Sequence, residues 1–363
     1  MRLRPRSASA AQLATSAEDD GRSGRGDDSV HPAAAARERF GRTSEWLVNL
    51  STVAFLGLTL PQILKNAANI SAGAGSALSV LPWTGYAASL VGNMLMLSYF
   101  VREEERAGAG VQVVGVLGNA AVLTQICVAG HMPAPLLVAV LCATSLGLAI
   151  NVSALLGGRE AQGRSGGAQW MQAVQGAWYA AAVLGGATTL PAVLLRACLD
   201  GGASAAATAA AAATACALAL AARRRAVVSL ADGSSGSAQL GSAWVGVGAW
   251  VATLHFMVLG VSQIAQNLRS PEALAGLSVS SVLIGAVGNA LMMPRALFLR
   301  DRVWLLGSTW GAVVSGWGCL MSVYLLGGVS GAFITAVTLA LCVHLAAIAA
   351  AERRSTGVAH AHA

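Results

Sequence analysis

Long apolar runs dominate the chain from Trp46 onward, and short polar clusters separate them. Each run is continuously apolar, whereas a membrane β-strand would alternate apolar and polar residues. About 20 apolar residues form a helix that crosses a hydrocarbon core of about 30 Å. The pattern predicts ten such helices, over residues 46–64, 77–100, 110–130, 133–156, 170–195, 203–222, 241–264, 277–299, 303–326 and 331–350. We therefore expect an all-α, polytopic membrane helix bundle.

The basic residues between the runs support this count, because loops on the non-translocated side of a membrane are enriched in Lys and Arg. With ten spans, one side receives both termini and most of the arginines, including the cluster at 223–225. The other side receives only Lys65, Arg196 and Arg269. An odd number of spans before residue 223 would remove the asymmetry. We expect both termini to face the stroma or cytoplasm.

Composition and charge exclude several classes of protein. Of 363 residues, 55% are hydrophobic and 11% are charged, which is far from the balance of a soluble domain. The net charge of +7 comes from arginines spread over termini and loops, so we expect no nucleic-acid partner. The cysteines and histidines show no metal-ligand spacing, and no nucleophile stands near a base. We expect no metal, no cofactor and no enzymatic activity.

The two ends of the chain differ from the rest. Arg2, Arg4 and Arg6 lie among Ser and Ala, no acid precedes Glu18, and the segment lacks the apolar stretch of a secretory signal. These features indicate that residues 1–45 are an organelle transit peptide, and a disordered tail is the alternative. Residues 351–363 form a polar tail.

Polar residues inside the apolar runs repeat along the chain. A Gln-Ile pair with an asparagine four residues after the glutamine occurs at Gln62 and again at Gln263, and the next run contains a Gly-Asn pair at Asn93 and Asn289. Both copies begin in odd-numbered spans, which predicts parallel repeats. We assign residues 46–156 and 241–350 to two related helix bundles, with 157–240 as weakly matched middle helices.

An amide in the middle of a span needs a polar partner and tends to face a cavity or another helix. Interhelical hydrogen bonding is therefore the alternative to ligand contact at these positions. Pro61 removes a backbone donor and is a candidate hinge, while the glutamines could instead cap helix ends. Trp83, Tyr86 and Trp250 could form the walls of a site, and Asn151 is a further amide within a span. The candidate substrate-binding residues are Asn93, Asn289, Gln62, Gln263, Asn119 and Trp83.

These segments carry a resemblance to known transporters. Pro61-Gln62 and Ser262-Gln263 resemble the PQ-loop motif of SWEET-type sugar transporters. Residues 61–64, 92–100, 276–289 and above all 294–301 (Pro-Arg-Ala-Leu-Phe-Leu-Arg-Asp) resemble the maltose excess protein family. The resemblance covers roughly residues 46–350 in order and is weak over 157–240.

The resemblance implies parallel PQ-loop-type repeats and a multi-pass maltose transporter of the chloroplast inner envelope, which exports maltose from starch breakdown. Transport of glucose or another small neutral solute, and a PQ-loop cargo receptor, are the alternatives. No acid lies within a span except Glu45 at an edge, so a proton relay is missing and facilitated transport of a neutral sugar is expected. We expect Arg295 to anchor a helix at the interface. The oligomeric state stays open.

Overall fold

The computed structural model describes residues 32–81, 83–162, 167–200, 237–269 and 277–356, together with Pro271 and Leu274. The predicted transit peptide up to residue 31, the predicted span 203–222 and the tail beyond residue 356 lie outside the described residues. The described part is all-α. Its helices are α2 (Pro32–Ser71), η1 (Gly75–Val80), α3 (Trp83–Arg102), α4 (Arg106–Val128), α5 (Ala134–Gln162), α6 (Gly167–Asp200), α8 (Ser237–Arg269), α9 (Val279–Phe298), α10 (Arg302–Trp310), η3 (Gly311–Gly318), α11 (Cys319–Leu325) and α12 (Gly331–Thr356).

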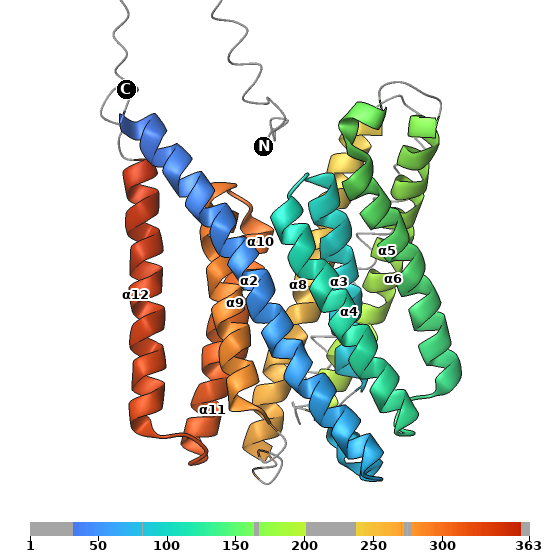
Figure 1. Ribbon diagram of the computed structural model, residues 1–363, viewed down its shortest axis with the longest axis vertical. Helices are drawn as coiled ribbons and strands as arrows, with labels where there is room; N and C mark the ends of the chain where they lie inside the picture. Colours follow the sequence, from blue (N-terminus) through green and yellow to red (C-terminus); the bar gives the residue numbers. More distant parts are fainter. Residues whose placement is uncertain are drawn as a thin grey trace, which may run out of the picture.

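Each of the nine predicted spans that fall on described residues overlaps a helix, where α10, η3 and α11 form one continuous segment. The span predicted over 77–100 starts too early, because its first residues belong to η1 and the long helix α3 begins at Trp83. Among the described helices, 6 are long and apolar enough to cross a membrane. They are Ala35–Ser71, Arg106–Val128, Ala134–Leu156, Val279–Phe298, Arg302–Leu325 and Gly331–Ser355. The helices α3, α6 and α8 run alongside them in the same bundle (Figure 1). The all-α fold is therefore confirmed for the described residues, with six helices that could cross a membrane, while a total of ten spans stays a prediction.

The first helix is longer at both ends than its apolar run indicated. The prediction was 46–64, but α2 extends over Pro32–Ser71 and continues through Pro61. Residues 32–45, assigned to the N-terminal segment by sequence, are its first turns. These turns are rich in Ala, Arg and Glu, which favour helix, and the charged residues among them lower the hydropathy of the segment. Hydropathy reports only the part of a helix that suits lipid, so it misplaced both ends and put Pro61 near a helix end.

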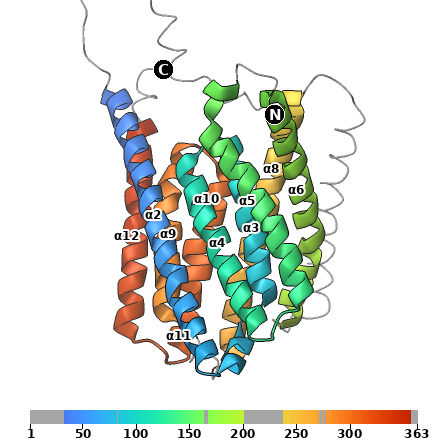
Figure 2. The ribbon, with the colours of Figure 1, turned by 45° about the vertical axis from the view of Figure 1, so that its right-hand side comes forward.

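The helices around the centre of the bundle form two sets. The first set is α2, α3 and α4, and the second is α8, α9 and the segment from α10 to α11. Within each set the third member packs against the other two. Between the sets, α2 packs against α9 and α3 packs against α8. Helices α5 and α6 flank one side of this centre and α12 the other, as Figure 1 and Figure 2 show.

The contacts between the two sets are reciprocal. The ring of Phe55 on α2 lies 3.0 Å from where a Cβ on Gly288 of α9 would be, and the ring of Phe256 on α8 lies 3.0 Å from the equivalent point on Gly92 of α3. Each phenylalanine stands the same number of residues before Gln62 or Gln263. The two interfaces therefore need glycine for the same reason, since a side chain there would displace an aromatic ring.

Candidate functional site

A cavity of about 450 Å³ lies between the two sets. All six of their helical members contribute lining residues. Five of the residues singled out from the sequence line it together: Gln62, Asn93, Asn119, Gln263 and Asn289. The tertiary structure thus gathers amides from five helices around one space.

Most of the remaining sequence candidates lie elsewhere. Trp83 opens α3 and packs against the hydrophobic core instead of lining the cavity. Pro61 is exposed within α2, and Trp250 is 42% exposed on α8. Asn151 is buried outside the cavity and donates to the Ser98 hydroxyl at 3.0 Å. Tyr86 does line the cavity.

Asn93 and Asn289 have matching surroundings. The Nδ2 of Asn93 donates to the backbone oxygen of Ser89 at 2.7 Å, and that of Asn289 donates to Gly285 at 2.8 Å. A Cβ on Gly115 of α4 would overlap the amide of Asn93, and one on Gly311 of η3 would overlap that of Asn289. Each amide is therefore held by its own helix and packed against a glycine of the third helix.

Gln62 and Gln263 also match. The Nε2 of Gln62 donates to Asn66 at 2.8 Å, and that of Gln263 donates to Asn267 at 2.9 Å. Both asparagines are buried, with 1% and 3% exposure, although α2 and α8 are far apart in sequence. An asparagine one helical turn later thus orients each cavity glutamine through a hydrogen bond. Both glutamines lie inside their helices, so neither caps a helix end.

The asparagine of each pair continues the network into the third helix of its set. Asn66 donates to Gln125 of α4 at 3.0 Å, and Asn267 donates to Ser322 of α11 at 2.9 Å. Counted from the glycine that packs against the central asparagine, Ser322 stands one position further along than Gln125. The π-helical segment η3 explains this difference, because a π-bulge accommodates one extra residue.

No Asp, Glu, Lys, Arg or His is among the described residues that line the cavity. The polar lining consists of amides, hydroxyls and indole groups, interspersed with apolar side chains. Charged ligands would need a counter-charge in such an enclosed place. The cavity therefore suits a neutral solute with both donors and acceptors.

Three lining residues that the sequence did not single out carry buried polar atoms without a hydrogen-bond partner. They are Gln112 Oε1, Trp304 Nε1 and Trp310 Nε1. Gln112 is a polar residue inside an apolar run, and that signal could have found it. The tryptophans gave no signal, because an indole in a membrane helix most often packs or lies at the interface.

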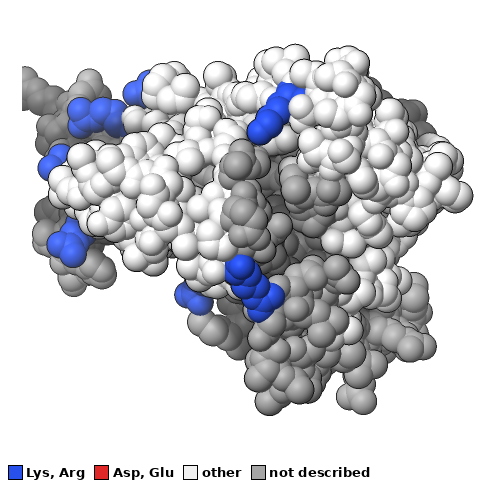
Figure 3. All heavy atoms as spheres, turned by 90° about the horizontal axis from the view of Figure 1, so that it is seen from below, with Lys and Arg blue, Asp and Glu red and all other residues white. Residues whose placement is uncertain are grey.

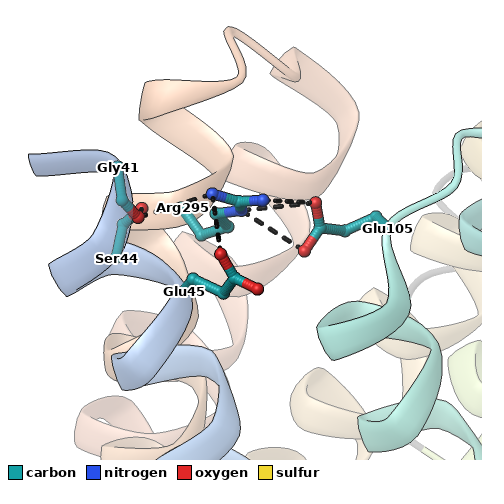
Figure 4. Close-up of polar contacts among 5 residues, drawn as sticks. All are labelled: Gly41, Ser44, Glu45, Glu105 and Arg295. Carbon is teal, nitrogen blue, oxygen red and sulfur yellow. Dashed lines mark hydrogen bonds and ion pairs between the residues drawn. The ribbon is translucent and has the colours of Figure 1, made fainter. Parts of the chain in front are cut away.

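Polar contacts between the sets close one end of the cavity. The Nη2 of Arg295 on α9 lies 2.9 Å from Oε2 of Glu105, next to α4. Its Nη1 donates to the Gly41 backbone oxygen of α2 at 3.4 Å and lies 4.0 Å from Glu45 (Figure 4). Arg295 is not a lining residue. Arg295 connects α9 to α2 and to the start of α4 at this end of the bundle. The sequence led us to expect that Arg295 anchors a helix at the interface, and the structure adds an ion pair with Glu105, which is remote in sequence.

A second contact lies at the same end. The Tyr99 hydroxyl of α3 donates to Asp301 at 2.6 Å, and Asp301 caps α10 by accepting from the Trp304 backbone N–H at 3.0 Å. The rings of Phe100 and Trp304 meet edge to face, with centroids 4.6 Å apart. We call this end, at the α3–α4 and α9–α10 turns, the closed end.

The opposite end is more accessible and carries little charge. Lining residues there, such as Gln62 and Leu277, are half-buried, whereas Gln112 and Trp304 near the closed end are 5% and 3% exposed. Viewed from this side, the described surface shows scattered Lys and Arg side chains and no Asp or Glu (Figure 3). This end corresponds to the side for which the sequence predicted few basic residues.

Comparison with known proteins decides the family. Residues 35–159 match a family model described as the Maltose excess protein 1 N-terminal domain. The chain is 31% identical over 316 residues to "Maltose excess protein 1, chloroplastic" of Arabidopsis thaliana, an alignment that covers 86% of this chain and 71% of the relative. The chain belongs to the maltose excess protein family. Another member, "Maltose excess protein 1-like, chloroplastic" of Oryza sativa subsp. japonica, is 32% identical over 296 residues, covering 81% of this chain and 69% of that one. No solved structure matches the chain.

Membership of the maltose excess protein family confirms the resemblance drawn from residues 61–64 and 294–301. The match to the N-terminal family model spans most of the first three-helix set together with α5. In this family member, the segment 294–301 holds Arg295 and Asp301, the two residues that fasten the closed end. Part of the most specific sequence motif therefore serves to join the two sets.

Proposed function

We propose that this chain transports maltose passively across the chloroplast inner envelope and exports the product of starch breakdown. The observation that carries the proposal is the cavity between the sets, with four amide side chains in matching positions and an uncharged lining among the described residues. The names of the two relatives support maltose and the chloroplast.

The size and chemistry of the cavity fit a disaccharide better than an ion. Its volume of about 450 Å³ lies within the range of small-molecule sites, about 300–1,000 Å³. Amides and hydroxyls can replace the water around sugar hydroxyls, while Phe55, Tyr86 and Phe256 offer flat apolar surfaces for the faces of the rings. A cargo receptor that grips a peptide carboxylate would need a positive charge in the cavity, and the described lining offers none.

We further propose that the two sets are parallel PQ-loop-type repeats in a bundle of ten spans. The matching asparagine, glutamine and phenylalanine contacts support this relationship. Helices α6 and α8 run in the same direction, as Figure 1 and Figure 2 show, so a ten-span topology needs a span between them, which is the place of the predicted span 203–222. Transport then proceeds when the sets rock about their interfaces and expose the cavity to one end at a time.

The direct test is uptake of radiolabelled maltose into proteoliposomes that contain the purified full chain. We expect uptake that saturates, that unlabelled maltose inhibits, and that exchanges with maltose inside the vesicles. Labelled glucose in parallel vesicles decides between a disaccharide transporter and a carrier of neutral sugars in general. Maltose uptake no faster than in protein-free vesicles would refute the proposal.

A further inference from the structure

The closed end of the cavity contains polar atoms that the protein itself does not satisfy. Gln112 Oε1 is an acceptor and Trp304 Nε1 is a donor, and both are buried without a hydrogen-bond partner. Buried polar groups in folded proteins are nearly always paired, so each exception needs an explanation. These atoms belong to cavity-lining residues, and together they offer the two complementary groups that a hydroxyl needs.

Trp304 lies at the start of α10 with only 3% of its surface exposed. Its backbone N–H is fixed by Asp301 at 3.0 Å, and its backbone oxygen accepts from the Ser308 hydroxyl at 2.6 Å. The ring of Phe100 packs edge to face with the indole, with centroids 4.6 Å apart. The unpaired indole N–H therefore belongs to a buried and packed side chain at the closed end.

The same end is shut by contacts that join the two sets. Arg295 and Glu105 connect α9 to the start of α4, and Tyr99 and Asp301 connect α3 to the start of α10. Gln112 lies on α4 and Trp304 on α10, the two helices whose starts these contacts join to the other set. The closed state thus leaves two buried polar atoms without hydrogen bonds, which is unfavourable. The ion pair and the hydrogen bond between the two sets offset this unfavourable free energy.

We propose that the solute route continues through the closed end, and that Gln112 and Trp304 bind solute hydroxyls there when the end opens. The inference rests on the proposed transport function and adds a second binding position along the route. A sugar hydroxyl donates to Gln112 Oε1, and another accepts from the Trp304 indole N–H. Solute binding then favours the open form, because it satisfies groups that the closed form leaves unpaired.

The experiment uses two pairs of matched variants of the full chain. Gln112→Met is compared with Gln175→Met, because Gln175 on α6 also carries a buried unpaired atom but does not line the cavity. Trp304→Phe is compared with Trp317→Phe, because the Trp317 indole N–H donates to Thr338 at 2.8 Å, away from the cavity. Each variant is measured for thermal stability, equilibrium binding of radiolabelled maltose, and uptake per folded molecule in proteoliposomes.

We expect uptake to fall about tenfold in Gln112→Met and Trp304→Phe, the effect of losing one hydrogen bond to a desolvated group. The Gln112 variant should keep its melting temperature, since the removed oxygen had no partner. Both control variants should keep wild-type uptake, and Trp317→Phe should melt at a lower temperature. Wild-type uptake in either cavity variant overturns the inference, as does an equal loss in the controls. Absence of maltose uptake by the wild-type protein overturns the proposed function and this inference with it.

Discussion

Arg295 and Glu105 form an ion pair between the two three-helix sets, with 2.9 Å between Nη2 and Oε2 and side-chain exposures of 14% and 8%. The two residues are 190 positions apart in sequence. Glu45 contributes a more exposed carboxylate at 4.0 Å, so the guanidinium is held mainly by Glu105. This arrangement makes the pair the principal electrostatic fastening of the closed end.

Removal of Glu105 should therefore loosen the bundle. Glu105→Ala leaves a largely buried guanidinium without its main partner, and loss of one member of such a pair costs about 3–5 kcal/mol. We expect the melting temperature in detergent to fall clearly, with partial recovery in the exchanged double variant Glu105→Arg with Arg295→Glu. The control is Glu38→Ala on α2, which breaks an exposed pair with Arg42 and should cost less than about 1 kcal/mol. Equal effects of the two alanine variants would contradict this reading.

The central asparagines should matter for transport more than for folding. Each donates only within its own helix, Asn93 to the backbone oxygen and hydroxyl of Ser89 and Asn289 to the backbone oxygen of Gly285, so Asn93→Leu or Asn289→Leu removes no bond between helices. Loss of a contact to a sugar hydroxyl costs about 1–3 kcal/mol, and about 1.4 kcal/mol corresponds to tenfold weaker binding. Uptake per folded molecule should fall steeply in both variants at normal folded yield. Asn151→Leu should show the reverse, because its amide bonds to Ser98 of another helix. Normal uptake in both cavity variants would refute the site.

The glycines behind these asparagines give an independent test of the same geometry. A methyl group on Gly115 or Gly311 would occupy the place of the asparagine amide, so the Ala variants should displace Asn93 or Asn289 and reduce maltose uptake. Gly110→Ala on α4 is the matched control, since nothing lies within 4 Å of its added Cβ. There the substitution should leave uptake unchanged and stabilise the helix by roughly 0.5–1 kcal/mol. Uptake assays and thermal melts of the three variants give the comparison.

Transport should follow the maltose gradient alone. The described cavity lining contains no carboxylate or histidine that could carry a proton with the sugar. Maltose inside proteoliposomes should therefore rise to the external concentration and stop, with or without an imposed pH difference. The measurement is the plateau of labelled maltose at several pH gradients. Accumulation above the external concentration under a pH gradient would show coupled transport instead.

The beginning of α2 sets a limit on N-terminal truncation. A chain without residues 1–31 should transport maltose normally in proteoliposomes. Removal of residues 1–45 should destabilise the protein, because it deletes Gly41 and Glu45, which contact Arg295, together with Ser44 beside them (Figure 4). Import assays with isolated plastids test the transit peptide, and both truncations should fail to enter the envelope. Efficient delivery to plastids of the chain that lacks only residues 1–31 would rule out a transit peptide.

The sequence by itself determined the fold class, the family and most of the cavity amides. Asn93, Asn289, Gln62 and Gln263 could be found because an amide in an apolar run is costly unless it has a polar partner, and that cost is visible in the local pattern. The family could be found because residues 294–301 form a contiguous motif. Hydropathy predicted where helices lie, but placed the ends of α2 wrongly because helix formation does not stop where lipid contact stops.

Only the tertiary structure decided which helices face one another. It brought Glu105 to Arg295, placed Gly115 and Gly311 against the asparagines, and put the unpaired atoms of Gln112 and Trp304 at the closed end. It also packed Trp83 against the outside of the core and away from the cavity. Such pairings depend on how side chains of distant segments fit together in three dimensions. A hydrophobic pattern cannot predict these pairings, because it shows which face of a helix is apolar but not which other helix packs against that face.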